Sequence, residues 1–138
     1  MQYTLAILKP DCVERKLTGK IIDFIESHDF EVFRLRKLQL TKKEAQAFYS
    51  MHKGRDFYEP LIEFMTSGPC LPIILKKDNA VDAFREVLGA TDLNKAADGT
   101  IRKLYAETIR RNVVHGSDSD ENAKKEIAFF FPTMNILV

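Results

Sequence analysis

Residues 30–40, which read FEVFRLRKLQL, decide the fold class because apolar and charged side chains alternate along them. Phe33 and Leu35 stand two residues apart and alternate with Arg34 and Arg36. Successive side chains of a strand point to opposite faces of the sheet, so this pattern predicts a strand with one face in solvent. A parallel sheet with helices on both faces has no solvated face for such arginines. The segment therefore favours an α+β fold with helices on one face of a largely antiparallel sheet.

The segments on either side of this strand show two periodicities, two residues for strands and 3.6 for helices. Thr41 and Glu44 have the spacing of a capping box, which begins a helix that Gly54 ends. The polar stretch at residues 89–99 predicts a loop of about ten residues, a length that is usually functional. Apolar runs predict further strands at residues 3–9, 71–75 and 112–114, and amphipathic patterns predict helices at residues 18–28, 57–67, 79–88, 100–106 and 119–130.

The 138 residues have the length and composition of one globular domain, which we expect to span residues 1–138. The 21 Lys and Arg residues nearly balance the 20 Asp and Glu residues, and the net charge of +1 predicts no long-range attraction to nucleic acid or anionic membrane. The absence of a long apolar run or a signal-peptide pattern predicts a cytoplasmic protein without a membrane span. Cys12 and Cys70 lie far apart in sequence, which favours free thiols over a disulfide, and the scattered histidines argue against a structural zinc site.

The most informative stretch for function is NVVHGSDS at residues 112–119. His115 follows a predicted strand and precedes Gly116 and a run of turn and helix-cap formers. This arrangement predicts an exposed histidine that is held in a fixed direction. Taken alone, it also fits an ordinary loop histidine near the start of a helix.

Three cationic residues stand at the ends of predicted elements. Lys9 ends the first strand, Arg85 lies in the last turn of a helix, and Arg102 follows the long loop. Each alone is typical of a surface charge. Together with His115, they are the groups needed to bind a polyphosphate and relay one phosphoryl group.

Six motifs in this order and spacing resemble the nucleoside diphosphate kinase family over nearly the whole chain. They are LAILKPD at residues 5–11, Tyr49-x-x-His52, SGP at 67–69, LGAT at 88–91, GTIR at 99–102 and NVVHGSDS at 112–119. The resemblance implies a ferredoxin-like βαββαβ sandwich with an antiparallel four-stranded sheet and added helices. It also implies ping-pong transfer of the γ-phosphoryl group of a nucleoside triphosphate to a nucleoside diphosphate through a phosphohistidine.

The resemblance assigns a role to each matching residue. His115 resembles the nucleophile, Glu126 the carboxylate that orients the catalytic pocket, and Ser117 the hydrogen-bonding companion of that carboxylate. Phe57 resembles the ring on which the base stacks, and stacking accepts any base, so the site should tolerate all of them. Leu61 and Ile109 surround that ring, Lys9 and Asn112 match the contacts to the ribose hydroxyls, and the phosphate channel is lined by Lys9, Tyr49, His52, Arg85, Thr91 and Arg102.

The family's Mg²⁺ is held mainly by the nucleotide phosphates, and no acidic cage for a metal is visible in this sequence. Leu93 stands where the family usually has a proline tied to subunit contacts, and Leu104 stands where an aspartate is usual. The C-terminal segment at residues 132–138 is apolar, and it is shorter than the C-terminal segment of animal members of the family. We expect this end to pack on a neighbouring subunit of a homo-oligomer, with dimer, tetramer and hexamer all open.

Two other classes of function remain to be weighed against an active kinase. A regulatory member with a dead site would lack His115, Arg102 or Lys9, and all three are present. A nucleic-acid-binding module on a ferredoxin-like sheet would need exposed aromatic residues on its central strands and a basic surface. The small net charge and the absence of such a motif argue against it.

Overall fold

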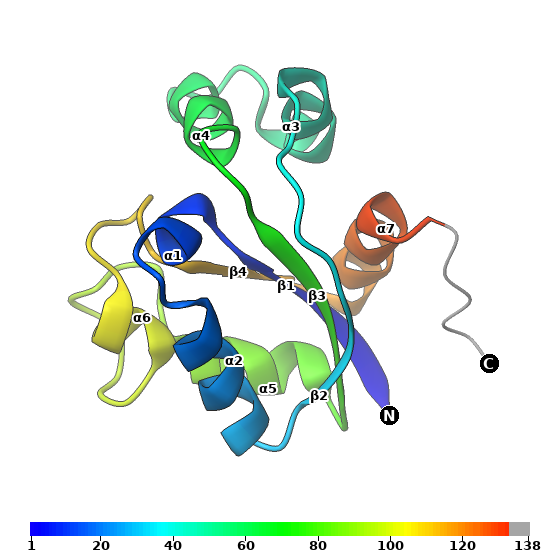
Figure 1. Cartoon of the computed structure of the whole chain (residues 1–138), viewed down its shortest axis with the longest axis vertical. Coiled ribbons are helices and arrows are strands. Elements are labelled where there is room, and N and C mark those ends of the chain that lie inside the picture. The colour runs from blue at the N-terminus through cyan, green and yellow to red at the C-terminus, as the bar shows by residue number, and fades with distance from the viewer. Residues whose placement is uncertain (133–138) are drawn as a thin grey trace.

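The structure, a computed structural model, describes residues 1–132 and centres on an antiparallel sheet with the strand order β2-β3-β1-β4 (Figure 1). β1 lies in the middle of the sheet and pairs antiparallel with both β3 and β4. β2 forms one edge and pairs antiparallel with β3 alone. The strands are β1 (Gln2–Leu8), β2 (Glu31–Leu35), β3 (Leu71–Lys77) and β4 (Val114–Gly116).

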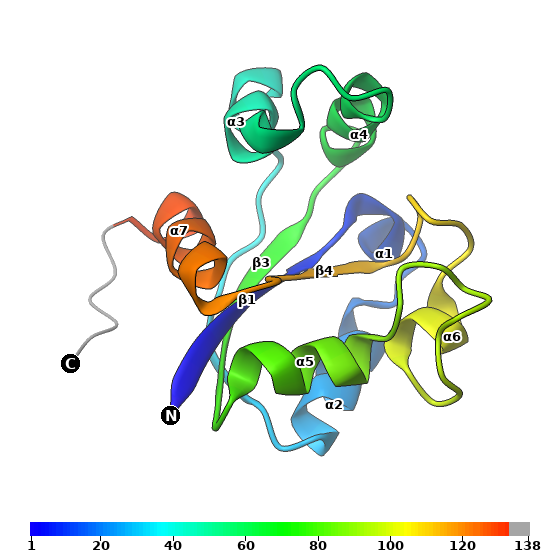
Figure 2. The ribbon, with the colours of Figure 1, turned by 180° about the vertical axis from the view of Figure 1, so that it is seen from behind.

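The helices complete a βαββαβ core and add to it. α2 connects β1 to β2, and α5 connects β3 to β4, which confirms the ferredoxin-like core (Figures 1 and 2). A hairpin of α3 and α4 is inserted between β2 and β3, α6 precedes β4, and α7 follows it. The helices are α1 (Pro10–Glu14), α2 (Thr18–Ser27), α3 (Lys42–Phe48), α4 (Tyr58–Met65), α5 (Ala80–Leu88), α6 (Ile101–Tyr105) and α7 (Asp120–Phe130), with a 3-10 turn η1 (Ser50–His52).

Both faces of the sheet are covered, so the expectation of helices on one face is wrong. Ala6 and Leu8 of β1 pack into a core with α2 and α5, whereas Leu5 and Ile7 pack into a second core with α3, α4 and α7. The two groups of helices lie on opposite sides of the sheet (Figures 1 and 2). The exposed arginines of residues 30–40 misled the prediction because β2 is an edge strand, where exposure reports the edge rather than a bare face.

Four local features differ from the sequence prediction. The helix predicted from the Thr41 capping box to Gly54 ends at Phe48 and is followed by the separate turn η1. α1 was not predicted, and it begins directly at Pro10, whose fixed φ suits the first turn of a helix. The strand predicted at residues 30–40 is shorter and ends at Leu35. The last strand is shifted from the predicted 112–114 because Val113 has a φ of +67°, which no strand residue adopts. His115 therefore lies inside β4 rather than after it.

The capping box, the polar loop and the free thiols are as the sequence predicts. The Glu44 N–H donates to Thr41 Oγ1 at 3.1 Å and the Thr41 N–H donates to Glu44 Oε1 at 2.9 Å, which completes the capping box of α3. Residues 89–99 contain neither helix nor strand. Cys12 and Cys70 are free and buried. Within residues 1–132, no helix is long and apolar enough to cross a membrane.

Gly116 allows α5 to approach β4 closely, directly beside His115. A Cβ atom at this position would lie 2.9 Å from Phe84 Cδ2 and 3.0 Å from Leu88 Cδ2, and both side chains are buried in the core. Real Cβ atoms are not found this close to carbon atoms, so any side chain here would push α5 away from the sheet.

Gly116→Ala should therefore lower the free energy of unfolding by ~1–3 kcal/mol, the usual cost of overpacking a core. Urea unfolding measures the effect. Gly19→Ala is the matched control, because Gly19 lies exposed on α2 and a Cβ atom added there would meet no other atom within 4 Å. Equal stability of the two variants would contradict the close packing.

Candidate active site

A cavity of about 780 Å³ brings together residues from widely separated parts of the chain, between Lys9 and His115. Most of its lining residues come from the end of β1, the start of β4, the hairpin of α3 and α4 and the loop that leads into β4. Figure 2 draws the ribbon of these segments. Of the residues predicted from the sequence, it is lined by Lys9, Tyr49, His52, Phe57, Leu61, Thr91, Arg102, Ile109, Asn112 and His115. The mixture of cations with aromatic and aliphatic groups suits a ligand with an anionic end and a flat apolar end.

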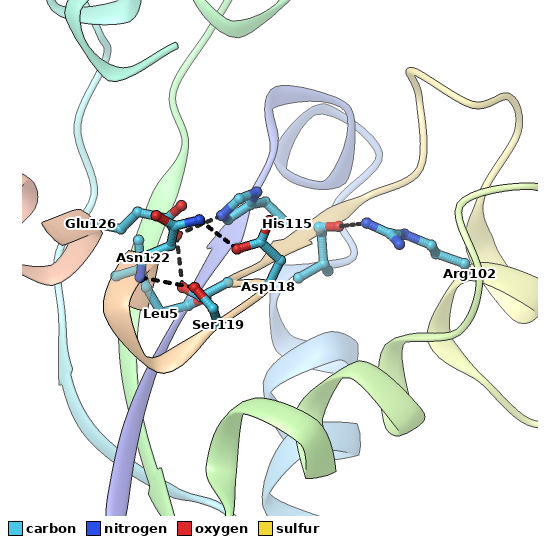
Figure 3. Close-up of polar contacts among 9 residues, drawn as sticks. Leu5, Arg102, His115, Asp118, Ser119, Asn122 and Glu126 are labelled. Carbon is cyan, nitrogen blue, oxygen red and sulfur yellow. Dashed lines mark hydrogen bonds and ion pairs between the residues drawn. The ribbon is translucent and has the colours of Figure 1, made fainter. Parts of the chain in front are cut away.

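One carboxylate oxygen joins Glu126 to two other predicted residues, His115 and Ser117, of which His115 lines the cavity (Figure 3 labels Glu126 and His115). Glu126 Oε1 lies 2.9 Å from His115 Nε2 and accepts a hydrogen bond of 2.7 Å from Ser117 Oγ. A carboxylate can only accept, so Nε2 must carry the hydrogen, and the lone pair of a neutral ring is then on Nδ1. Both side chains are largely buried, at 23% exposed for His115 and 13% for Glu126, which protects their bond from water. The expectation of an exposed histidine is therefore wrong.

The main chain fixes the position of this group. His115 pairs with Ile7 of β1, and the Ser117 N–H donates to the Leu5 carbonyl at 3.1 Å. Phe48 of α3 meets the His115 ring edge-on, with ring centroids 6.0 Å apart. The contact of Phe48 with the histidine was not predicted from the sequence. The imidazole is thus held by a strand, a carboxylate and an aromatic ring.

Lys9 reaches the cavity from the end of β1 and is itself almost fully buried. Its ammonium donates to Asn112 Oδ1 at 2.7 Å, and Asn112 Nδ2 donates to the Ile109 carbonyl at 2.8 Å. Burial, and then repulsion by Arg102, lower the pKa of Lys9 from the ordinary 10.5 to about 8, whereas Asp11 opposes the shift. The lysine remains mainly cationic at neutral pH, and a bound anion would stabilise that charge.

Three oxygen atoms from the loop after α5 and from β4 hold the side chain of Arg102, which lies on α6. Its guanidinium donates to the Gly89 carbonyl at 3.1 Å, to Thr91 Oγ1 at 3.2 Å and to the Val114 carbonyl at 3.0 Å (Figure 3 draws the last). Burial, and then the charge of Arg85, lower its pKa to about 10, so it is always cationic at neutral pH. A fixed, desolvated guanidinium is a strong site for phosphoryl oxygens.

The opposite end of the cavity is apolar and open. Phe57 is 41% exposed and Ile109 is 66% exposed, which is unusual for such large apolar side chains unless a ligand covers them. Phe57 also contacts His52, with ring centroids 5.1 Å apart. Thr108 and Arg110 line the same cavity and were not predicted. Their only signal in the sequence is that they flank Ile109.

Arg85 is the one predicted binding residue that does not line this cavity. It lines an adjoining cavity of about 380 Å³, which shares Thr91 and Arg102 with the first. Its placement in the phosphate channel therefore stays a prediction. Leu104, where the family usually has an aspartate, is 55% exposed, and Leu93 is half-buried. The predicted subunit contact of the C-terminal end falls on residues 133–138, outside the described residues.

The lining of the cavity suits anions rather than a bare metal ion. In the part of the chain that the structure describes, no group of three or more His, Cys, Asp and Glu side chains could hold a metal ion. Lys9, Arg102 and Arg110 are the charged residues of the lining, apart from the histidines.

Comparisons with known proteins agree on one family. A family model described as nucleoside diphosphate kinase matches residues 2–136. Over 137 residues the chain is 54% identical to a nucleoside diphosphate kinase of Chlorobaculum parvum, covering 99% of this chain and 98% of the relative. It is 56% identical over 133 residues to one from Chloroherpeton thalassium, covering 96% and 94%.

Solved structures give the same result. A crystal form of the Aquifex aeolicus nucleoside diphosphate kinase superposes with a TM-score of 0.90 at 37% identity, covering 94% of each chain. A halophilic nucleoside diphosphate kinase from Halobacterium salinarum, solved in complex with CDP, gives a TM-score of 0.90 at 32% identity, covering 94% of this chain and 87% of the other.

The buried charge of Lys9 should appear in the pH dependence of stability. The pKa of Lys9 is about 8 in the folded protein and near 10.5 in the unfolded protein, so the unfolded state binds more protons between pH 8 and 10.5. The free energy of unfolding therefore rises with pH in this range. Between pH 8 and 9.5 the wild type should gain ~1–2 kcal/mol relative to Lys9→Met, measured by urea unfolding at both pH values. If the free energy of unfolding changed equally in the two proteins between pH 8 and 9.5, Lys9 would not be desolvated.

Proposed function

The chain belongs to the nucleoside diphosphate kinase family, and we propose that His115 carries the phosphoryl group between its two nucleotides. Members of this family are phosphotransferases that move the γ-phosphoryl group of a nucleoside triphosphate to a nucleoside diphosphate. The observation that supports His115 is the bond of its Nε2 to Glu126. This bond leaves the lone pair of a neutral ring on Nδ1, at the edge of a cavity lined with cations.

In the first half-reaction, Nδ1 attacks the γ-phosphorus of the triphosphate. An N–P bond forms, the bond between the γ-phosphorus and the β-bridging oxygen breaks, and the electron pair leaves with the nucleoside diphosphate. The imidazole becomes cationic because Nε2 keeps its hydrogen, and the Glu126 carboxylate stabilises that charge. The Ser117 hydroxyl holds the carboxylate in place as a positioning group.

In the second half-reaction, a β-phosphate oxygen of another nucleoside diphosphate attacks the phosphorus and the N–P bond breaks. The first nucleotide must leave before the second one binds, because both use the same cavity. Initial-rate plots should therefore show parallel lines, as expected for a covalent relay.

Lys9, Arg102 and Thr91 supply the donors for the phosphate oxygens. Arg102 is already fixed by the carbonyls of Gly89 and Val114, so it needs no reorganisation as charge moves toward the leaving phosphate. The Lys9–Asn112 pair is bonded through Asn112 to the main chain of Ile109, at the apolar end, which suits contacts to the sugar hydroxyls. Tyr49, His52 and Arg85 add polar groups along the channel.

Phe57, with Leu61 and Ile109 around it, would take the base by stacking. Stacking contributes ~1–3 kcal/mol per base and depends little on which base it is. We therefore expect broad tolerance of purines and pyrimidines. The Halobacterium salinarum structure was solved in complex with CDP, which supports a nucleoside diphosphate as a ligand of this chain.

Mg²⁺ is proposed to arrive as part of the nucleotide substrate. It prefers phosphate oxygens and water, and the cationic lining of the cavity offers it no carboxylate cluster among the described residues. The buried free thiols of Cys12 and Cys70 fit a reducing cytoplasm, where we place the protein. The exposed Leu35 and Leu104 support a homo-oligomer, with dimer, tetramer and hexamer open.

Incubation with Mg²⁺ and ATP labelled on the γ-phosphate tests the assignment of His115. The wild type should take up label that is stable to base and labile to acid, and should pass it to added nucleoside diphosphate. His115→Ala should bind ADP but stay at background, because the nucleophile is gone while the other contacts remain. His52→Gln is the matched control, since it alters a histidine of the same cavity and should still be labelled.

Two outcomes would overturn this assignment. Label on His115→Ala would place the phosphohistidine elsewhere, with His52 the next candidate. A wild type that binds ADP but takes up no label would favour a regulatory member of the family with a dead site.

A further inference from the structure

Asp11 has no exposed surface, and the mechanism above gives it no role. Its Oδ2 accepts a hydrogen bond of 3.1 Å from the Val113 N–H. Its Oδ1 is buried and has no hydrogen-bond partner within residues 1–132. Burying a carboxylate is costly unless it is paired with donors or charges, and the cost raises the pKa of Asp11. A carboxylate in this place therefore needs an explanation beyond packing.

The group that Asp11 holds is a backbone segment in a rare conformation. Val113 has a φ of +67°, and a β-branched residue reaches this left-handed region only under constraint from its surroundings. Asp11 binds its N–H, and the Lys9 N–H donates to its carbonyl at 2.8 Å. Val113 lies directly between Asn112 and β4, so its conformation sets the directions of both Asn112 and His115.

Asp11 also balances the charge of this corner of the cavity. Lys9 and Arg102 are two desolvated cations that repel each other, and Asp11 is the anion that favours the charged form of Lys9. The positive charge of Arg111, in the loop that precedes β4, attracts Asp11. The other polar groups that line the cavity with Lys9 are Tyr49, His52, Thr91, Thr108, Arg110, Asn112 and His115, none of which is a carboxylate.

We propose that Asp11 is a positioning residue for the Lys9–Asn112 pair: its carboxylate holds Val113 in the left-handed conformation and places an anion beside Asn112 and Val113, the two residues that Lys9 contacts. The proposal rests on the proposed function only in giving that pair a nucleotide to bind. Asp11 touches no substrate. It acts through the backbone of Val113 and through the charge of Lys9.

The backbone part is tested without any ligand, by hydrogen exchange of the Val113 amide. Asp11→Ala removes the acceptor, so this amide should exchange about tenfold faster or more, the effect of losing a hydrogen bond to a charged group. Cys12→Ala is the matched control, because Cys12 is equally buried on α1 but packs in the core. If the Val113 amide exchanged as slowly in Asp11→Ala as in Cys12→Ala, the proposed role of Asp11 in holding Val113 would be overturned.

The charge part is tested by the affinity for ADP as a function of pH. Asp11→Asn keeps the shape and an acceptor oxygen but removes the charge, so it should bind ADP within about threefold of the wild type at pH 6.5. In the wild type, affinity should fall above pH about 8 as Lys9 loses its proton. In Asp11→Asn that fall should begin at a lower pH, because the nearby anion is gone.

A structural role alone would not move this profile, and Cys12→Ala should leave it unchanged. Superposable profiles of Asp11→Asn and wild type would overturn the charge part of the proposal. If Asp11→Ala fails to fold, Asp11→Asn still tests the charge of Lys9. Failure of the proposed function is distinct: it would appear as unlabelled wild type, and the amide exchange would still decide the role of Asp11.

Discussion

The site depends on one oxygen atom, Glu126 Oε1, which accepts from both His115 Nε2 and Ser117 Oγ. This bond requires α7 to lie against β1 and β4 to pair with β1, so segments more than a hundred residues apart in sequence must meet correctly. The two cores on opposite faces of the sheet enforce that meeting. The fold therefore determines which nitrogen of the imidazole carries the lone pair.

The rest of the site accepts conformations and charges that a stable core would avoid. Val113 has left-handed backbone, and Lys9 and Arg102 are desolvated cations. Each of these features works against stability when the cavity is empty. A polyphosphate would relieve the repulsion between the two cations, so binding energy and the folding energy of the site are linked.

Much of this was predictable from the sequence, and the failures have physical causes. The order of strands and helices followed from periodicity, and the six motifs identified the family. The prediction that helices cover only one face of the sheet was wrong because an edge strand and a strand with one solvated face show the same alternation of apolar and charged residues, here at Arg34 and Arg36. The last strand was misplaced because a valine favours strands unless a tertiary contact, here with Asp11, forces it elsewhere. Phe48 and Arg110 were missed because their contacts exist only in three dimensions.

The most direct test of this account is the nitrogen that carries the phosphoryl group. Protein containing ¹⁵N-histidine, phosphorylated with ATP, can be examined by NMR for coupling between ³¹P and each ring nitrogen of His115. Because Glu126 occupies Nε2 through a hydrogen bond, the account predicts coupling to Nδ1 alone, with a hydrogen retained on Nε2. Coupling to Nε2 would contradict it, since that nitrogen could not then be the one that Glu126 holds.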